Sequence, residues 1–287
     1  MDNANTTVTF MNPDSEPSQP AVLKARKITV KFGSSVILDG VDFVAKSHQL
    51  IGVLGPSGSG KSTLLMALSG FRPANEGSVL FNSEDLYDNF ESLKRGIGFV
   101  PQDDVVPTSL KVERVLKYAA DLRLPDLSPE VREGRVNGVI TKMGLSERRK
   151  LRVNKLSGGQ RKRVSVACEL LSRPDLFFAD EPTSGLDPAL ELSMMQLLRE
   201  MANEGRIIIV TTHIMTSLAL LDLVCLLNKG QLAYFGPPDQ IKNYFQVSDF
   251  SEIYHLLGTR PPTEWRNAFQ KHPLFTEYLS SALRSTL

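Results

Sequence analysis

Residues 49–62, Gln-Leu-Ile-Gly-Val-Leu-Gly-Pro-Ser-Gly-Ser-Gly-Lys-Ser, decide the fold of this chain. The segment begins with a nearly continuous apolar run, as expected for a strand buried on both faces of a sheet. Residues 55–62 then match the pattern G-x-x-x-x-G-K-[ST], in which backbone N–H groups and a helix N-terminus converge on phosphate oxygens. The segment therefore predicts a phosphate-binding loop, with Lys61 reaching the phosphates and the Ser62 hydroxyl available to Mg²⁺. An ordinary glycine turn with a solvated lysine is the weaker alternative.

The composition limits the kinds of partner. The 287 residues carry 33 Lys and Arg against 32 Asp and Glu, for a net charge of +1, so any contact with nucleic acid or an anionic membrane must be local. The basic cluster at 148–152 has no interleaved aromatic residue, which predicts a solvated surface and no nucleic-acid partner. Cys168 and Cys225 both lie in apolar sequence, which indicates buried free thiols. The most apolar run, 218–227, is about half the roughly 20 residues that a transmembrane helix needs.

Strand and helix patterns alternate along the rest of the chain. Residues 1–20 are polar and proline-rich and predict a disordered leader, whereas 21–44 have the pattern of half-buried strands. Residues 108–154 are helical in pattern and read as an insertion. The segment after Gly236 is amphipathic and lacks strand signals. Short strands are predicted at 77–81 and 97–100, and the pattern of buried strands returns at 176–179 and 207–210 with a helix between them. Strands that alternate with helices indicate a parallel α/β sheet.

A pair of carboxylates follows one of these predicted strands. Asp180 and Glu181 come directly after the apolar run 176–179. The carboxyl end of a strand is where an open α/β sheet presents its ligand groups. We therefore expect Asp180 to hold Mg²⁺, directly or through water, and Glu181 to polarise an attacking water. A solvated acidic pair is the alternative, which the phosphate-binding loop makes the weaker one.

Residues 156–160, Leu-Ser-Gly-Gly-Gln, precede a predicted helix that begins near Arg161. Ser157 can cap that helix, and the two glycines leave backbone N–H groups free to contact an anion. A plain capped junction between a loop and a helix explains the same residues. This segment alone therefore leaves both interpretations open.

Taken in order, these elements resemble the ATP-binding cassette (ABC) family of ATPases. Residues 156–160 match the family signature, and Gln102 after Val-Pro matches the Q-loop. Ser-Gly-Leu-Asp at 184–187 matches the D-loop, and His213 after Val-Thr-Thr matches the switch histidine. The resemblance covers about residues 22–245 and implies ATP hydrolysis with ATP and Mg²⁺ as cofactors. It implies an α/β fold, a P-loop NTPase (RecA-like) core with a mostly parallel sheet, an N-terminal antiparallel β subdomain and an inserted α-helical subdomain.

The resemblance also implies the residues of the site. Two copies are expected to face head to tail, with each ATP between the phosphate-binding loop of one copy and the signature of the other. Phe32 stands where the family places an aromatic that stacks on adenine, usually Tyr, although a core position would explain it as well. The catalytic set implied is Glu181, His213, Gln102 and Lys61, and the metal set is Ser62, Gln102 and Asp180. The nucleotide-binding set is Phe32, Gly55, Pro56, Ser57, Gly58, Ser59, Gly60, Lys61, Ser62, Thr63, Ser157, Gly158, Gly159, Gln160 and Asp187.

The resemblance divides the chain and suggests a subfamily. Beside the leader at 1–20, it implies a nucleotide-binding domain at 21–245, with its helical subdomain at about 103–165, and a helical connector at 246–287 that leads toward a membrane domain. Residues 60–70, 102–108 and 159–165 are similar to the ABCG (White-type) exporters, which commonly carry Glu at the position of Gln160. Residues 262–269 and 273–279 resemble the connector of those exporters.

We therefore predict the ATP-driven engine of a longer exporter, on the cytoplasmic side of the cell membrane. It would act through a transmembrane domain and as a homodimer or heterodimer of nucleotide-binding domains. Two alternatives stay open. One is a non-transport ABC protein of DNA repair or translation, although no long coiled coil separates Lys61 from Ser157. The other is an importer ATPase with a separate permease chain, which the connector-like tail disfavours.

Overall fold

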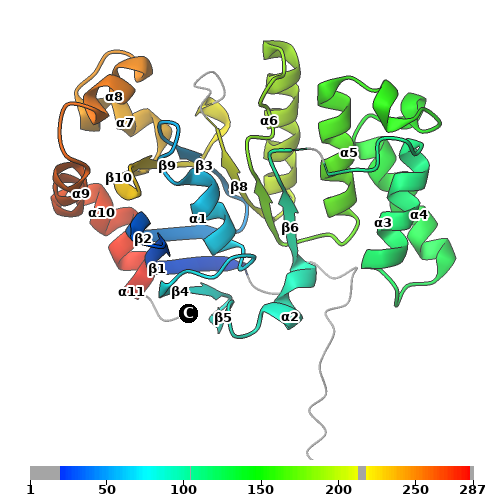
Figure 1. Ribbon diagram of the computed structural model, residues 1–287, viewed down its shortest axis with the longest axis horizontal. Coiled ribbons are helices and arrows are strands. Elements are labelled where there is room, and N and C mark those ends of the chain that lie inside the picture. The colour runs from blue at the N-terminus through cyan, green and yellow to red at the C-terminus, as the bar shows by residue number, and fades with distance from the viewer. Residues whose placement is uncertain (1–19, 104, 213–217, 285–287) are drawn as a thin grey trace, which may run out of the picture.

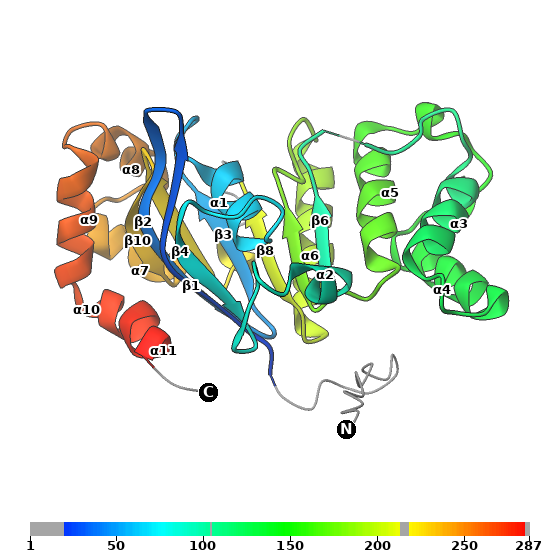
Figure 2. The ribbon, with the colours of Figure 1, turned by 60° about the horizontal axis from the view of Figure 1, so that its bottom comes forward.

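The computed structural model describes residues 20–103, 105–212 and 218–284. A helical subdomain lies at one end of the molecule and the C-terminal helices lie at the other, with two sheets between them (Figures 1 and 2). The predicted leader, apart from Pro20, and the predicted switch histidine His213 fall outside the described residues.

The larger sheet has six strands in the order β10-β9-β3-β8-β7-β6. All neighbouring strands are parallel except the antiparallel pair β9–β10. Every residue of β3, β7, β8 and β9 is buried, because helices or the second sheet cover both faces. The strands are β3 (Leu50–Leu54), β6 (Ile97–Val100), β7 (Leu176–Ala179), β8 (Ile207–Thr211), β9 (Leu223–Asn228) and β10 (Gln231–Gly236).

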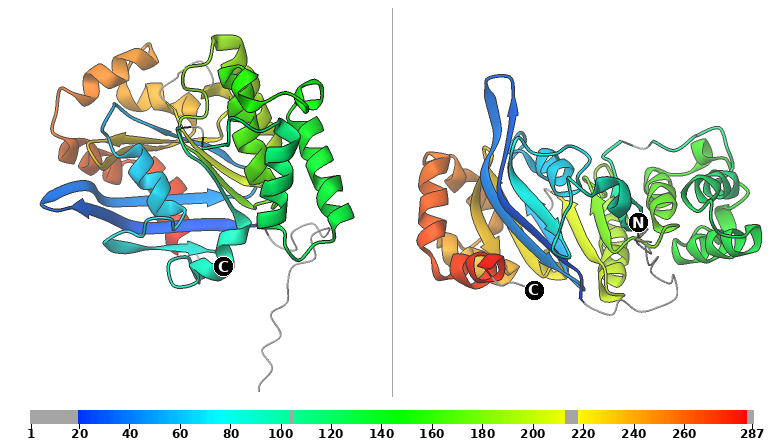
Figure 3. Two further views of the ribbon diagram at one scale, coloured as in Figure 1. Left: turned by 45° about the vertical axis from the view of Figure 1, so that its right-hand side comes forward. Right: turned by 90° about the horizontal axis from the view of Figure 1, so that it is seen from below.

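The smaller sheet is antiparallel, with the order β2-β1-β4-β5. Its strands are β1 (Val22–Phe32), β2 (Ser35–Lys46), β4 (Glu76–Phe81) and β5 (Glu84–Asp85), so half of them follow the phosphate-binding loop in the chain. It lies beside the larger sheet (Figure 3), and the rings of Phe43 in β2 and Phe235 in β10 pack edge to face between the two sheets, with their centroids 5.4 Å apart. The predicted fold class, a P-loop NTPase core with an antiparallel β subdomain and a helical insertion, is confirmed.

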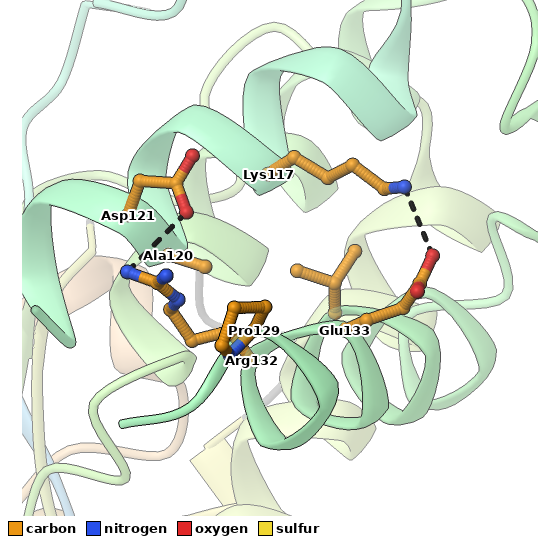
Figure 4. Close-up of a pocket in the computed structure, with 7 residues that line it drawn as sticks. Lys117, Ala120, Asp121, Pro129, Arg132 and Glu133 are labelled. Atoms are coloured by element: carbon orange, nitrogen blue, oxygen red, sulfur yellow. Dashed lines mark hydrogen bonds and ion pairs between the residues drawn. The ribbon is translucent and has the colours of Figure 1, made fainter. Parts of the chain in front are cut away.

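The helical subdomain is built from α3 (Val112–Arg123), α4 (Pro129–Lys142) and the long helix α5 (Gly158–Leu170). Ion pairs join α3 to α4, Lys117 to Glu133 at 2.9 Å and Asp121 to Arg132 at 3.5 Å. They flank a hollow of about 210 Å³ (Figure 4). The remaining helices of the core are α1 (Lys61–Leu68), α2 (Phe90–Leu93) and α6 (Pro188–Asn203), with short 3₁₀ turns η1 (Lys94–Gly96), η2 (Ser146–Arg148), η3 (Val153–Lys155) and η4 (Leu218–Leu220).

The C-terminal helices form a layer on β10 and β2. Contacts between aromatic rings stabilise the layer. The ring centroids of Trp265 and Phe245 lie 5.3 Å apart, and those of Phe269 and Tyr234 of β10 lie 5.7 Å apart. An ion pair at 2.8 Å from Arg266 to Asp39 ties the layer to β2. Its elements are α7 (Pro238–Phe245), α8 (Phe250–Leu257), α9 (Pro262–Lys271), α10 (Pro273–Phe275), the π-helical turn η5 (Thr276–Ser280) and α11 (Ser281–Arg284).

The structure adds two details to the sequence analysis and corrects one, the start of the signature helix. The apolar run at 218–227 contributes most of β9, which forms a hairpin with β10 through the two-residue turn Lys229–Gly230. The signature helix begins at Gly158 and not near Arg161. Residues 35–46 form one continuous strand through Asp39-Gly40. Within the described ranges, no helix combines the length and the apolar character needed to cross a bilayer.

Candidate active site

The phosphate-binding loop occupies the gap between β3 and α1, where the chain leaves the sheet and enters the helix (Figure 1). Gly60 has φ 98°, and a Cβ there would lie 2.8 Å from the Leu38 side chain. Only glycine fits, because the β1–β2 hairpin presses on the loop. Gly60 is also the N-cap of α1 and offers no side chain to its free N–H groups. With no acidic residue in the first turn either, this helix end favours an anion.

Lys61 is buried within this loop. Its Nζ donates to the carbonyl oxygens of Gly55 at 2.9 Å and Pro56 at 3.1 Å, so it clasps its own loop. Burial lowers the pKa of Lys61, and the nearby carboxylates of Glu181 and Asp180 partly offset that shift. A desolvated ammonium gains more from a phosphate than a solvated one does, because it has already lost much of its hydration.

Thr211 of β8 contacts both acidic residues at the end of β7. Its hydroxyl donates to Asp180 Oδ1 at 2.5 Å and accepts the backbone N–H of Glu181 at 2.7 Å. Glu181 has φ 44°, a left-handed conformation that costs about 1–3 kcal/mol in a residue other than glycine and persists where the surroundings impose it. Its Oε2 accepts from Gln102 Nε2 at 3.3 Å. The structure thus brings together Lys61, Gln102, Asp180 and Glu181 at the carboxyl ends of the parallel strands.

Two polar residues of this site were missed by sequence reasoning. One is Thr211. The other is Lys162 of α5, which is buried and donates from Nζ to the carbonyl oxygens of Gln102 at 2.7 Å and Pro101 at 3.2 Å. The sequence did contain a signal for Lys162. It falls on the same helix face as the buried residues Gly159 and Val166, three positions before it and four after it. A lysine on a buried face is rarely found without polar partners.

The signature residues form a capping box at the start of α5. Ser157 Oγ accepts the backbone N–H of Gln160 at 3.3 Å, and Gln160 Oε1 accepts that of Ser157 at 3.1 Å. The predicted cap is therefore present. Either Gln or Glu fills the third position of such a box, so Gln160 keeps the local structure that Glu would give. Figures 1 and 2 place α5 on the helical side of the molecule, apart from α1, so the helix that carries the signature lies away from the phosphate-binding loop of its own chain.

The remaining predicted residues occupy varied positions. Phe32, at the end of β1, is 39% exposed, and the Arg72 guanidinium lies 4.1 Å from its ring centroid. An exposed ring does not fit a core position.

Asp187 caps α6 by accepting from the N–H groups of Ala189 at 3.1 Å and Leu190 at 3.0 Å. The other members of the predicted nucleotide set lie along the loop and the first turn of α1: Pro56, Thr63 and Gly60 are half-buried, Gly55 and Ser59 are buried, Ser57, Gly58 and Ser62 are exposed, and Gly158 and Gly159 follow Ser157.

The donor set suits Mg²⁺ that is shared with a phosphate chain. Ser62 offers a hydroxyl, Gln102 an amide oxygen and Asp180 a carboxylate. The described residues contain no group of three or more His, Cys, Asp or Glu side chains placed to hold an ion. Mg²⁺ does not need one, because it commonly keeps several waters and binds through one or two carboxylates plus substrate phosphates.

The fold and site define a P-loop ATPase. A family profile described as "ABC transporter" matches residues 38–184. The chain belongs to the ABC transporter family, whose ATP-binding domains are ATPases.

Relatives with known names agree with this assignment. The chain is 43% identical over 231 residues to an ABC transporter ATP-binding/permease protein of Mycobacterium tuberculosis, covering 80% of this chain and 27% of that protein. It is 39% identical over 248 residues to ABC transporter G family member 22 of Arabidopsis thaliana, covering 80% and 33%. It is also 36% identical over 222 residues to an Fe(3+) ions import ATP-binding protein of Streptomyces avermitilis, covering 77% and 64%. The chain thus spans about a quarter to a third of the first two relatives.

A solved structure of the ATP-binding subunit of an ABC transporter has the same fold. It superposes with a TM-score of 0.72 at 25% identity, covering 83% of this chain and 100% of that one. The predicted family is therefore confirmed by both sequence and fold.

Proposed function

We propose that this chain binds and hydrolyses ATP with Mg²⁺ and thereby powers export through a transmembrane domain, as a G-type ABC transporter module on the cytoplasmic side of the membrane. The observation that carries the hydrolytic part is the gathering of Lys61, Gln102, Asp180 and Glu181 beside a glycine loop. Similarity to the G family member and to the ATP-binding/permease protein supports the transport part.

The residues divide the work as follows. The N–H groups of 55–62 receive the phosphates, and Lys61 exchanges the carbonyls of Gly55 and Pro56 for phosphate oxygens. Ser62 and Asp180 would hold Mg²⁺, which neutralises charge on the β- and γ-phosphate oxygens when bound. Glu181 accepts a proton from the attacking water, and Gln102 orients that carboxylate from the side. The family resemblance adds His213, outside the described residues, as a contact to the γ-phosphate.

A second copy would complete the site. Ser157 and Gly158 are exposed at the start of α5, and the capping box fixes the backbone there, with the Ser157 N–H donating to Gln160 Oε1 at 3.1 Å. Placed head to tail, the signature of one copy would reach the γ-phosphate bound on the other. ATP would then close the dimer and phosphate release would open it.

An apolar groove beside Gln102 supports a membrane partner. It has a volume of about 270 Å³ and lies between β6, α3 and α5. Its rim carries large apolar side chains that a protein rarely leaves in water without reason: Val105 is 74% exposed, Leu122 83% and Tyr118 47%. A helix of the transmembrane domain seated there would contact the segment that holds Gln102, and so would connect transport with the hydrolytic site.

An importer ATPase that works with a separate permease chain is the second candidate. Similarity to the Fe(3+) ions import ATP-binding protein favours it. The coding sequence beyond Leu287 separates the two. About six apolar segments of roughly 20 residues each would establish the exporter, whereas an immediate stop codon would favour the importer.

The hydrolytic part is tested by phosphate release from the purified chain with Mg·ATP. We expect measurable turnover in the wild type and a loss of about 100-fold or more in Glu181→Gln, which keeps the shape of the side chain but cannot take a proton. ATP binding should be retained in this variant, and a nucleotide-bound dimer should accumulate in size-exclusion chromatography. Wild-type turnover in Glu181→Gln would overturn the assignment of the base.

A further inference from the structure

The connection between α4 and α5 concentrates positive charge on a chain whose net charge is only +1. Residues 148–155 contain no acidic residue, and Lys111 at the start of α3 lies beside them, because it forms an antiparallel bridge with Arg152. From the sequence alone, 148–152 is predicted to be a solvated surface, and the structure adds neighbours that the sequence does not show. We call the exposed cations of this region the basic patch: Lys111, Arg148, Lys150, Arg152 and Lys155.

The cations of the basic patch form no ion pair with any of the residues that the structure describes. Arg149, in the middle of the segment, differs from them, because it is half-buried and its Nε lies 3.3 Å from Glu113 Oε2. That pair occupies the acidic residue nearest to Lys111 in the chain. Exposed cations gathered at this density create a local positive potential, which attracts an anionic surface or ligand.

The backbone beneath the basic patch is fixed by its neighbours. The N–H of Val112 donates to the carbonyl oxygen of Leu151 at 3.0 Å, and the N–H of Val153 donates to that of Leu110 at 2.9 Å. The Val153 side chain is buried, whereas Leu151, between Lys150 and Arg152, is 41% exposed. An apolar side chain presented among cations suits a membrane surface, which offers charged headgroups with an apolar layer beneath them.

The basic patch is continuous with the apolar groove in which we place a transmembrane helix. Leu110 lines that groove, and Lys111 follows it in the chain. Arg114 Nη1 donates to the hydroxyl of Tyr118, on the groove rim, at 3.1 Å, and so extends the positive charge along the groove. A transmembrane helix that ends in the groove brings the bilayer surface to the same side of the helical subdomain. The cytoplasmic leaflet carries anionic lipids that attract cations close to the membrane.

We propose that the basic patch binds the anionic headgroups of lipids in the cytoplasmic leaflet. An acidic protein segment would meet the same charges, but the exposed Leu151 and the continuity with the groove favour a lipid surface. The contact is local, as the near-neutral charge of the whole chain requires. This inference rests on the proposed function, because it is the transmembrane partner that brings the basic patch to the membrane.

The experiment measures sedimentation of the full 287-residue chain with vesicles. One set is phosphatidylcholine alone, and the other is an equimolar mixture of phosphatidylcholine and phosphatidylserine. We expect the wild type to bind only the anionic vesicles, and to bind them more weakly as salt is raised, because salt screens the attraction. The triple variant Arg148→Gln/Lys150→Gln/Arg152→Gln should bind them about 30-fold more weakly, since each cation near an anionic leaflet contributes to the attraction.

A second triple variant is the matched control. Lys27→Gln/Lys46→Gln/Lys271→Gln removes the same charge from exposed positions outside the helical subdomain. It should bind the anionic vesicles as the wild type does. Both triple variants should keep turnover of Mg·ATP in solution, because neither changes a residue of the proposed site.

Leu151→Ser separates a lipid surface from an acidic protein segment. It keeps every charge but removes the apolar side chain, so it should weaken binding to the anionic vesicles about fivefold and leave binding to a poly-glutamate peptide unchanged. Wild-type binding to poly-glutamate with none to anionic vesicles would overturn the proposal and indicate an acidic protein partner.

The remaining outcomes are equally decisive. Equal weakening in both triple variants would overturn the basic patch and leave an effect of net charge. A wild type that hydrolyses Mg·ATP but binds no anionic vesicle would sink this proposal alone. A wild type without turnover would instead sink the hydrolytic part of the proposed function, whatever the vesicles show.

Discussion

The edge of the parallel sheet carries the phosphate-binding loop and the start of α5 carries the signature, and the two regions differ in how many side chains they bring together. At the sheet edge, Lys61 clasps Gly55, Gln102 contacts Glu181, and Thr211 holds Asp180. At the start of α5, Ser157 is exposed, the capping box with Gln160 fixes the backbone, and Arg161 donates to the carbonyl oxygen of Leu156 at 2.8 Å.

If a second copy completes the site as proposed, one chain holds two complementary halves of it. The half at the sheet edge groups the residues proposed to bind and hydrolyse ATP. The half on α5 would present the start of a helix to the phosphate bound on the other copy. We therefore expect nucleotide affinity to be a property of the single chain, and turnover to be a property of a pair.

Ser157→Asp is expected to give the largest effect. Asp caps a helix as well as Ser does, so the fold should be retained, but its charge would oppose a γ-phosphate across the dimer. We predict that turnover falls about 100-fold or more while the Kd for ATP of the single chain stays within about twofold. Ser157→Thr keeps both cap and hydroxyl and is the control. Equal loss of turnover and affinity would contradict the division into halves.

Mixing two inactive variants tests whether the site is shared between two copies. Ser157→Asp has an intact sheet edge, and Lys61→Ala has an intact signature. A mixed dimer contains one complete site, so phosphate release should reappear on mixing although neither variant shows it alone. Failure of every mixing ratio to restore turnover, with both variants folded, would count against a site shared between copies.

Lys61 should give the next largest effect, on affinity rather than on turnover alone. Lys61→Ala removes a buried ammonium beside the phosphate-binding loop, and we expect the Kd for ATP to rise about 50-fold, in line with the loss of charge-assisted contacts.

The affinity of the wild type for ATP should also depend on pH, through the protonation of Lys61. Burial lowers the pKa of Lys61, so the cation is lost at a lower pH than in a solvated lysine as pH rises through the lowered pKa. Titrations between pH 7 and the alkaline limit of stability should show affinity falling in the wild type and flat in Lys61→Ala.

Phe32 tests how far the binding half extends toward the base. Its ring is 39% exposed and backed by Arg72, so one aromatic face is offered for stacking. Stacking of a base on an aromatic side chain is worth about 1–3 kcal/mol, and we expect Phe32→Ala to raise the Kd for ATP about tenfold. Phe32→Tyr should keep wild-type affinity. If inorganic triphosphate lost as much affinity as ATP in Phe32→Ala, the ring would not be contacting the base.

Sequence alone predicted the sheet edge far better than it predicted the contacts within it. The strand at 50–54 and the loop after it combine a buried apolar run with an unambiguous glycine pattern, and both formed as expected. The sequence did not predict a strand within the apolar run 218–227, which contains most of β9. Periodicity alone cannot distinguish a short buried strand from a buried helix. The contact from Gln102 to Glu181 joins residues 79 positions apart, and no local pattern reports such a distance in sequence.

Lys162 shows why sequence patterns did not predict the rest of the site. Its substitution is also expected to give the smallest loss of turnover. Lys162 donates to the backbone carbonyl oxygens of Pro101 and Gln102. Every residue has a backbone carbonyl, so the residue types at 101 and 102 give no sign of this contact.

By holding those carbonyls, Lys162 joins the helix of the signature half to the Q-loop of the binding half. Lys162→Met keeps the stem but leaves two buried acceptors without this donor, which should lower Tm by about 2–4 °C in a domain of this size. We expect kcat to fall about threefold with KM unchanged, because the carboxylate of Glu181 would lose its steady neighbour while the phosphate-binding loop stays in place. Lys162→Arg can still donate to both carbonyls and should recover most of the lost turnover. A Tm loss with wild-type kcat would reduce Lys162 to a stabilising contact and remove the link between the two halves within one chain.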